Sequence, residues 1–186
     1  MDSSKLFQSY IQGNRDFHAV NLSQLNLAGV NFKQIELRGA NLNLSVLQGA
    51  NLQEANLTKA SLWRTNLNKG ICQATNFCRA VLIRANFQEA NLEQALFRRA
   101  DLRLTDLSNA DLRGADLTGA NLSYANLEGT NLTGATLHLA DFTGANIIDS
   151  NFSQAKLYKT NFHRTNINKA IWQDVDLGEN NLVKVS

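Results

Sequence analysis

The stretch Ala110–Gly119 reads ADLRG-ADLTG and shows the five-residue unit that decides the fold. We number the positions of this unit 1 to 5. From Phe17 to Leu182 an apolar residue occupies position 3 of 34 consecutive units, with 22 Leu, 8 Phe, 2 Ile, Cys72 and Trp172. Position 1 is Ala, Ser, Thr or Gly in 27 of these units, and position 2 is Asn or Asp in 25. Such regularity indicates a chain of stacked repeats rather than a mixed globular domain.

A period of five fits neither an α-helix, with 3.6 residues per turn, nor a long strand, with two. It fits a short extended segment followed by a corner. Residues two apart in an extended chain point the same way, so positions 1 and 3 face inward and position 2 faces out. Eight of the eleven glycines, Gly29 among them, occupy position 5, where a type II turn requires positive φ. Repeated corners of one hand then wind the chain into a coil whose turns hydrogen-bond about 4.8 Å apart.

The motif of a small residue, Asn or Asp, Leu or Phe and two variable residues resembles that of the pentapeptide-repeat family, and it covers roughly nine-tenths of the chain. The resemblance implies an all-β fold, the right-handed quadrilateral β-helix, with four units and hence 20 residues in each coil. The 34 units then make about eight coils of a solenoid. The stretch Gly13–Phe17, which follows a short predicted helix, is similar to cyanobacterial members of the family.

The N-terminal residues 1–13 are predicted to form a helical cap over the end of the solenoid, because a solenoid needs its terminal core covered. Gly13 can end this helix. Larger residues at position 1 of the first coil also suggest a wider coil fitted to a lid. The apolar face of the helix comprises Leu6, Phe7, Tyr10 and Ile11, and the larger inward residues are Val20, Leu25, Val30 and Ile35.

The C-terminal end is predicted from a change in the pattern. Val175 and Asn180 break the small-residue rule at position 1, so the regular core is expected to end near Leu182. The solenoid is therefore assigned to residues 14–182 and a tail to residues 183–186. Quinolone-resistance members of the family dimerise through their C-terminal coils, and the resemblance makes a homodimer through this end an open possibility.

The outer surface is predicted to be electrically two-sided, since residues 20 apart stack on one wall. The walls built on Phe17 and Leu22 carry 12 Lys and Arg against 7 Asp and Glu, whereas those built on Leu27 and Phe32 carry 4 against 8. Arginine and tryptophan are typical of interface hot spots, and a contiguous exposed apolar patch usually has a use. The predicted interaction face comprises Arg38, Leu44, Lys59, Trp63, Arg64, Arg79, Ile83, Arg84, Arg98, Arg99, Arg103, Leu104 and Tyr124. The alternative is that Trp63 and Tyr124 only cover the stems of neighbouring arginines.

No catalytic, metal-binding or cofactor-binding site is predicted. His18 and His138 share a wall but stand six coils apart, so they cannot form a metal site or an acid–base pair. The four aspartates from Asp101 to Asp116 fall on four different walls. Cys72 is expected to face inward as a small apolar residue, and Cys78 to lie at a corner without a base beside it.

The outward asparagines at position 2 also have a structural interpretation. Stacked side-chain amides can stabilise such a wall without binding any ligand. We therefore expect amide ladders to explain them.

The predicted function is a non-enzymatic scaffold, in a regulatory role, that docks an unidentified protein partner. One alternative comes from the family, because some pentapeptide-repeat proteins resemble duplex DNA and bind DNA gyrase. Those members are strongly acidic and often carry loops, whereas this chain has a net charge of +2 and an unbroken register. Direct nucleic-acid binding by the basic side is the other alternative, and the small net charge disfavours it.

The predicted location is the cytoplasm, with reduced thiols. The first 13 residues lack the pattern of a secretory signal, and no apolar stretch reaches the roughly 18 residues of a membrane span. The spacing of Cys72 and Cys78 matches no disulfide framework or zinc site.

Overall fold

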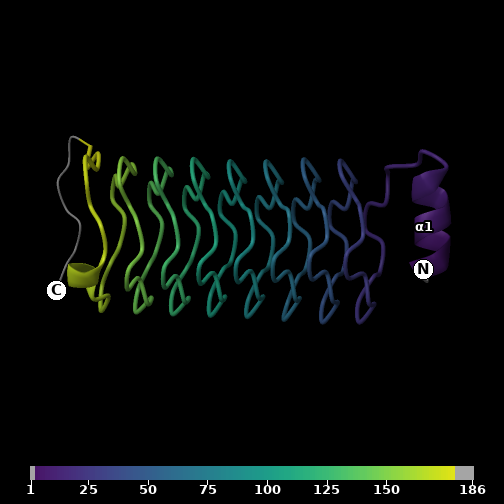
Figure 1. The fold of residues 1–186 in the computed structure, drawn as a ribbon, viewed down its shortest axis with the longest axis horizontal. Helices are drawn as coiled ribbons and strands as arrows, with labels where there is room; N and C mark the ends of the chain where they lie inside the picture. Colours follow the sequence, from purple (N-terminus) through teal and green to yellow (C-terminus); the bar gives the residue numbers. More distant parts are fainter. Residues whose placement is uncertain (1–2, 179–186) are drawn as a thin grey trace.

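The structure, a computed structural model, describes residues 3–178 of the 186-residue chain. One helix, α1 (Ser3–Ile11), lies at one end of a rod of stacked coils (Figure 1). A short 3₁₀ helix, η1 (Ile167–Lys169), lies near the other end. The extended segments form 28 isolated parallel bridges, from Asp16–Glu36 to Lys156–Asp176, and every bridge joins residues 20 apart. Each coil therefore contains four units, and the rod has four walls.

Three backbone hydrogen bonds of each regular unit join one coil to a neighbouring coil. In the unit centred on Leu47, the N–H of Leu47 donates to the carbonyl oxygen of Asn66 at 2.7 Å, and the N–H of Gly49 donates to that of Asn68 at 2.9 Å. The following residue at position 2, Asn51, donates back to Val30 at 2.8 Å. These bonds leave the N–H at position 4 without a backbone acceptor in the neighbouring coil.

The side chain at position 2 accepts a hydrogen bond from that remaining N–H. Asn76 Oδ1 accepts from the N–H of Cys78 at 2.9 Å, and an Asn or Asp does the same in most units. Amide stacking, which we expected, does occur, as between Asn146 Nδ2 and Asn126 Oδ1 at 2.9 Å. It is the less frequent contact, so the main role of position 2 is to satisfy the backbone donor two residues later.

The corners adopt a left-handed conformation whichever residue occupies them. All 23 non-glycine residues with positive φ lie at position 5, with φ between 51° and 60°. The eight glycines at this position have φ between 64° and 69°. Between Ala19 and Asp174 the single exception is Lys169, which lies in η1. Glycine is favoured there but not required, because the bonds between coils hold every corner in one geometry.

The interior of the rod is filled as predicted. Leu102, Leu107, Leu112 and Leu117 are fully buried. Burial raises the pKa of the Cys72 thiol to about 12, which leaves it protonated and unreactive at neutral pH. Buried threonines at position 1 donate to a carbonyl oxygen one coil back, and no buried side-chain nitrogen or oxygen of residues 3–178 lacks a partner.

Helix α1 covers the first coil, as the sequence predicts. Leu6 is fully buried, and the rings of Phe7 and Tyr10 lie 5.5 Å and 5.2 Å from that of Phe32. The Tyr10 hydroxyl also donates to the carbonyl oxygen of Lys33 at 2.8 Å. The prediction for Ile11 is wrong, because this side chain is 81% exposed. It occupies the last turn of the helix and points away from the coil.

The regular pattern is interrupted near the end of the described residues. Bridging is interrupted at Asn166, where η1 replaces an ordinary corner, and it resumes with the bridge between Asn151 and Ile171. The indole of Trp172 stacks on Phe152 with 4.4 Å between ring centres, and its Nε1–H donates to the carbonyl oxygen of Ile167. The predicted core end near Leu182 and the tail of residues 183–186 lie outside the described residues.

Candidate interaction surface

One wall of the rod lies between two rows of corner residues that are mainly basic or large and apolar. We name it the second wall; in the middle coils it is built on Leu62, Leu82 and Leu102. The first corner row, on one side of it, comprises Lys59, Arg79 and Arg99. The second corner row, on the other side, comprises Leu44, Arg64, Arg84, Leu104 and Tyr124. Neighbours within a row are 20 residues apart and therefore lie one coil apart, at about 4.8 Å.

Apolar side chains lie between these rows. Trp63 and Ile83 are half-buried at position 4, and Val81 is exposed at position 2. Leu104 and Tyr124 extend the apolar area along the second corner row, and Tyr124 is 57% exposed. A shallow hollow of about 440 Å³ is lined by Ile83, Arg103, Leu104, Asn121, Ser123 and Tyr124. The second wall thus offers an apolar floor and one depression in it.

The backbone at Trp63 is held by a residue that sequence reasoning missed. Position 2 of this unit is Ser61, whose side chain is shorter than Asn and does not accept the N–H of Trp63. Asn43, one coil back, accepts that N–H at 2.8 Å and also the hydroxyl of Ser61 at 2.8 Å. The signal was the serine in place of Asn or Asp, which leaves an N–H in need of another acceptor.

The two aromatic residues of this surface, half-buried Trp63 and exposed Tyr124, lie against their neighbours. The guanidinium of Arg64 lies over the indole of Trp63, 4.8 Å from the ring centre, so these two side chains form a cation–π pair. The Tyr124 ring lies on Gly144 of the next coil, where an added Cβ would stand 2.7 Å from Tyr124 Cε1. Each ring therefore contacts a neighbouring residue, an arginine guanidinium for Trp63 and a glycine for Tyr124. They still leave exposed surface for a partner.

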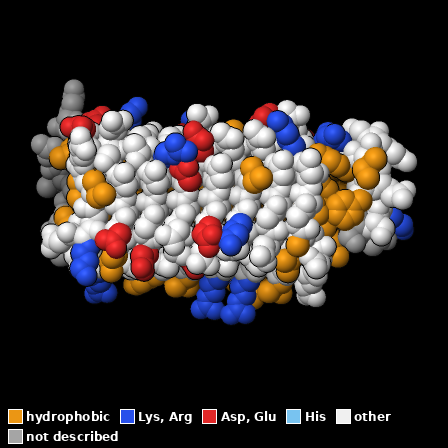
Figure 2. Space-filling model, in the orientation of Figure 1, with side chains coloured by type: hydrophobic (Ala, Val, Ile, Leu, Met, Phe, Trp, Pro, Cys, Tyr) orange, Lys and Arg blue, Asp and Glu red, His pale blue; other side chains and the backbone are white. Residues whose placement is uncertain are grey.

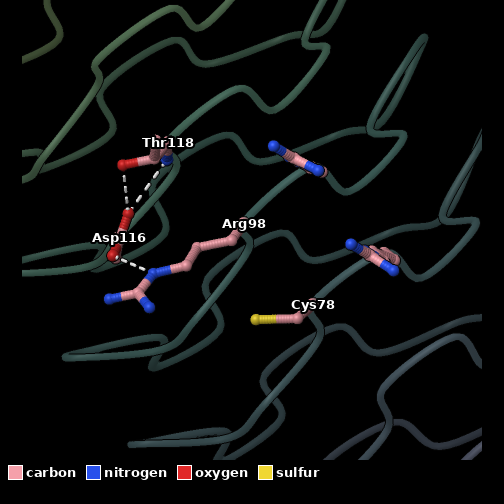
Figure 3. A pocket seen from close by; sticks show the side chains of 6 residues that line it. Cys78, Arg98, Asp116 and Thr118 are labelled. Carbon is pink, nitrogen blue, oxygen red and sulfur yellow. Dashed lines mark hydrogen bonds and ion pairs between the residues drawn. The ribbon is translucent and has the colours of Figure 1, made fainter.

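Two of the predicted arginines are engaged within the protein. Arg103 forms a two-pronged contact with Asp101, at 2.8 Å and 2.7 Å. Arg98 bends onto Asp116, which also accepts hydrogen bonds from the Thr118 hydroxyl and N–H (Figure 3). Burial alone would raise the pKa of Asp116, but the contacts from Thr118 and Arg98 together lower it. These charges are largely neutralised in place.

Four other cations are not engaged in this way. The side chains of Lys59, Arg79, Arg84 and Arg99 form no ion pair and no side-chain hydrogen bond with another residue between 3 and 178. All four are exposed and lie on the two corner rows. In Figure 2, Lys and Arg side chains project from one long edge of the rod with apolar side chains on either side of them.

The structure brings eleven of the thirteen predicted residues together on the second wall and its corner rows. Arg98 and Arg38 lie on the adjoining wall that is built on Phe17, Leu37 and Phe97. Arg98, with Cys78, Arg79, Arg99, Asp116 and Thr118, lines a hollow of about 580 Å³ there (Figure 3). Arg38 lies near Asp16, whose pKa is lowered mainly by its hydrogen bond with His18 and to a smaller extent by Arg38.

No group of three or more His, Cys, Asp or Glu side chains that could hold a metal ion occurs between residues 3 and 178. Cys78 is half-exposed, and its nearest hydrogen-bond contact is a weak one to the carbonyl oxygen of Leu96 at 3.9 Å. In the same part of the chain, no helix is long and apolar enough to cross a membrane.

Comparison with known proteins agrees with the repeat seen in the sequence. The pentapeptide-repeat family matches the chain in eight copies, which together span residues 16–171. No protein of known, curated function matches the sequence.

Solved structures with the same fold include two that cover most of the chain. HetL, a pentapeptide repeat protein involved in heterocyst differentiation regulation from the cyanobacterium Nostoc sp. strain PCC 7120, is 29% identical with a TM-score of 0.52. That match covers 95% of this chain and 94% of HetL. A trypsin-treated variant of QnrB1, a plasmid-mediated fluoroquinolone resistance protein, is 18% identical with a TM-score of 0.69 and covers 91% of this chain and 87% of its own. The second likeness shows the fold alone. The chain belongs to the pentapeptide-repeat family, and its fold is the right-handed quadrilateral β-helix.

Proposed function

We propose that this protein is a non-catalytic scaffold, acting in the cytoplasm in a regulatory role, that docks a protein partner on the second wall. The observation that carries the proposal is the set of four exposed cations, Lys59, Arg79, Arg84 and Arg99, which have no acidic partner between residues 3 and 178. They frame an exposed apolar floor.

The energetics of the corner rows favour a partner. Lys59, Arg79 and Arg99 lie in successive coils, so like charges repeat about every 4.8 Å along the edge. Their mutual repulsion is relieved by solvent and salt, and it is relieved further by an acidic surface that excludes water. Trp63, Ile83 and Tyr124 add the aromatic and aliphatic contacts that typically carry most binding energy.

The likeness to HetL supports a regulatory role. HetL is involved in heterocyst differentiation regulation, it shares 29% of its residues with this chain, and the two chains correspond over nearly their whole lengths. QnrB1, at 18% identity, lends no support to a role with gyrase. The basic second wall also differs from the acidic surface that imitation of DNA requires.

The test is affinity capture from the native organism with a double variant, Trp63→Ala with Arg84→Ala. We expect capture of the partner to be lost while the circular dichroism spectrum stays unchanged. The matched control is Lys69→Ala with Ile71→Ala, which removes an exposed cation and an exposed apolar residue from a different side of the rod. Equal capture by the double variant and the native protein would refute the proposal.

The partner class and the oligomeric state have separate tests. A gel-shift assay at low salt would detect direct nucleic-acid binding, and a supercoiling assay would detect action on gyrase. A homodimer through the C-terminal coil stays a prediction, and analytical ultracentrifugation measures it.

A further inference from the structure

We infer that the partner element bound by the second wall is an acidic amphipathic α-helix that lies along the axis of the rod. This inference rests on the proposed function and deepens it. The helix places carboxylates against the two corner rows and an apolar stripe on the floor between them.

The repeat distance of the cations selects a helix over an extended segment. Two coil steps separate Lys59 from Arg99, a distance of about 9.6 Å at the strand spacing. Two turns of an α-helix rise about 10.8 Å, a mismatch of about 1 Å that long side chains absorb. In an extended segment, residues on one side repeat about every 6.8 Å, so two steps span about 13.6 Å. One carboxylate per helical turn therefore meets one cation per coil.

Both corner rows carry cationic side chains without an ion pair, which favours a ligand with acidic groups along both of its edges. Within residues 3–178, no carboxylate pairs with the three cations of the first corner row, Lys59, Arg79 and Arg99. The same is true of Arg84 on the second corner row. The guanidinium of Arg64 lies over the face of Trp63 and forms no ion pair with a residue between 3 and 178. A helix with Glu or Asp on both edges of its apolar stripe supplies carboxylates to each row at once.

The floor selects a protein helix over a nucleic acid. A phosphate backbone would match the cations but offers nothing to Trp63, Val81 and Ile83, whose side chains lie between them. An apolar stripe at helical spacing covers these residues.

The hollow lies beyond one end of the row of cations, so it determines which end of the bound helix is acidic and which is apolar. The cations occupy the coils of Lys59 to Arg99, and the second corner row then continues with the uncharged Leu104 and Tyr124. The hollow beside them holds about 440 Å³ and takes one large apolar side chain. The bound helix is thus acidic over the coils nearer α1 and ends on an apolar anchor at Tyr124.

The first experiment selects a phage-displayed library of random 16-residue peptides on the full-length protein. A 16-residue helix is about 24 Å long and spans about five coils. We expect selected peptides to carry Asp or Glu at intervals of three and four residues and to gain helical circular dichroism on binding. A failure to select any peptide, or selection of peptides without this acidic pattern, overturns the inference.

Charge reversal provides the second measurement. Arg79→Glu with Arg99→Glu is expected to weaken binding of a selected peptide at least about tenfold, and a peptide with Lys in place of its acidic residues should recover binding. Glu54 and Glu89 already occupy corner positions, so the backbone accepts these changes. Lys69→Glu, on another corner, is the control and should leave peptide binding unchanged. Unchanged binding by the reversed protein overturns the inference, as does tighter binding of a 20-base-pair DNA than of the peptides.

A third measurement separates this inference from the proposed function. A photo-crosslinking residue at Ile83 is joined to the native partner, and mass spectrometry identifies the joined segment. An acidic helical segment supports both ideas. A segment of another kind, with capture still dependent on Trp63 and Arg84, overturns the inference and leaves the proposed function standing. Capture that does not depend on these residues removes both.

Discussion

The hydroxyl of Thr130 donates a hydrogen bond of 2.7 Å to the carbonyl oxygen of Leu107, one coil back and inside the rod. Thr130 is fully buried, and the same oxygen also accepts the N–H of Ala110 at 3.0 Å. Threonine is therefore accepted at position 1 because the neighbouring coil satisfies its hydroxyl.

Thr130→Val is expected to lower the free energy of unfolding by about 1 kcal/mol, the net value of one neutral hydrogen bond. The shape is nearly unchanged, and Val20 and Val30 already occupy this position in other units. Thr130→Ala should lose more, because it also leaves a cavity. Urea denaturation measures both, and a valine variant as stable as the native protein would contradict the assigned role of the hydrogen bond.

Gly144 and Gly134 provide a matched pair of corner glycines. Both have positive φ, but an added Cβ meets nothing within 4 Å at Gly134 and stands 2.7 Å from Tyr124 Cε1 at Gly144. We expect each alanine variant to lose about 1 kcal/mol, the cost of a left-handed non-glycine residue. Only Gly144→Ala should displace the Tyr124 ring, change the near-ultraviolet circular dichroism and weaken partner binding. Identical spectra and binding for the two variants would show that Tyr124 does not depend on this glycine.

Three phenylalanines form an aromatic cluster in the middle of the rod. Phe77 and Phe97 stack at 5.0 Å, and Phe87 meets both edge-on at 5.6 Å and 6.3 Å. Phe87→Ala should cost about 3–5 kcal/mol. Each coil contacts only its neighbours, so the loss of hydrogen-exchange protection should centre on the coils around Phe87 and spare α1. Mass spectrometry maps this protection, and a uniform loss along the chain would show that the rod unfolds as one unit.

The aspartates of the outer walls predict a loss of stability in acid. Hydrogen bonds from Arg103 and Arg113 lower the pKa values of Asp101 and Asp111. A carboxyl with a lowered folded-state pKa stabilises the protein above its unfolded pKa of about 4, and this stabilisation is lost as the pH falls through the folded value. Stability should therefore decline below about pH 4.

Asp111→Asn is the matched variant for this pH dependence. Asparagine occupies position 2 in many units and still accepts the N–H at position 4, so the fold should be retained. The variant cannot titrate, and its stability should decline less steeply below about pH 4 than that of the native protein. Denaturation at a series of pH values measures the slope of stability against pH for both proteins. Equal slopes would show that Asp111 does not contribute to the loss of stability in acid.

The period of the sequence was sufficient to predict a coiled chain with inward leucines. The four walls followed from the resemblance to the family, and the N-terminal helix from apolar residues at helical spacing before the first unit. The period was not sufficient to predict the irregularity at Asn166, which obeys the position rules and yet is the N-cap of η1. The exposure of Ile11 was also missed, because helical spacing does not show which residues of the last turn reach the first coil.

The composition of the candidate surface was predictable, but its charge state was not. The four-sided coil places Arg79, Arg84 and Arg103 on the second wall and its corner rows, and Arg98 on the adjoining wall. Whether an arginine folds back onto a carboxylate depends on the course of a long side chain over the wall. Arg98 reaches Asp116, 18 residues ahead, and Arg103 reaches Asp101 in its own unit. Sequence spacing alone does not distinguish these from Arg79 and Arg84.

The left-handed corners have a consequence for how such a protein changes during evolution. Because position 5 keeps one backbone geometry with Gly, Arg, Leu, Glu or Tyr in place, its side chain can be exchanged with little effect on the path of the chain. Positions 1 and 3 preserve the architecture, while each substitution at a corner changes one exposed side chain in a regular array of corner positions. Duplicated copies can thus acquire new partners by substitution at the corners alone.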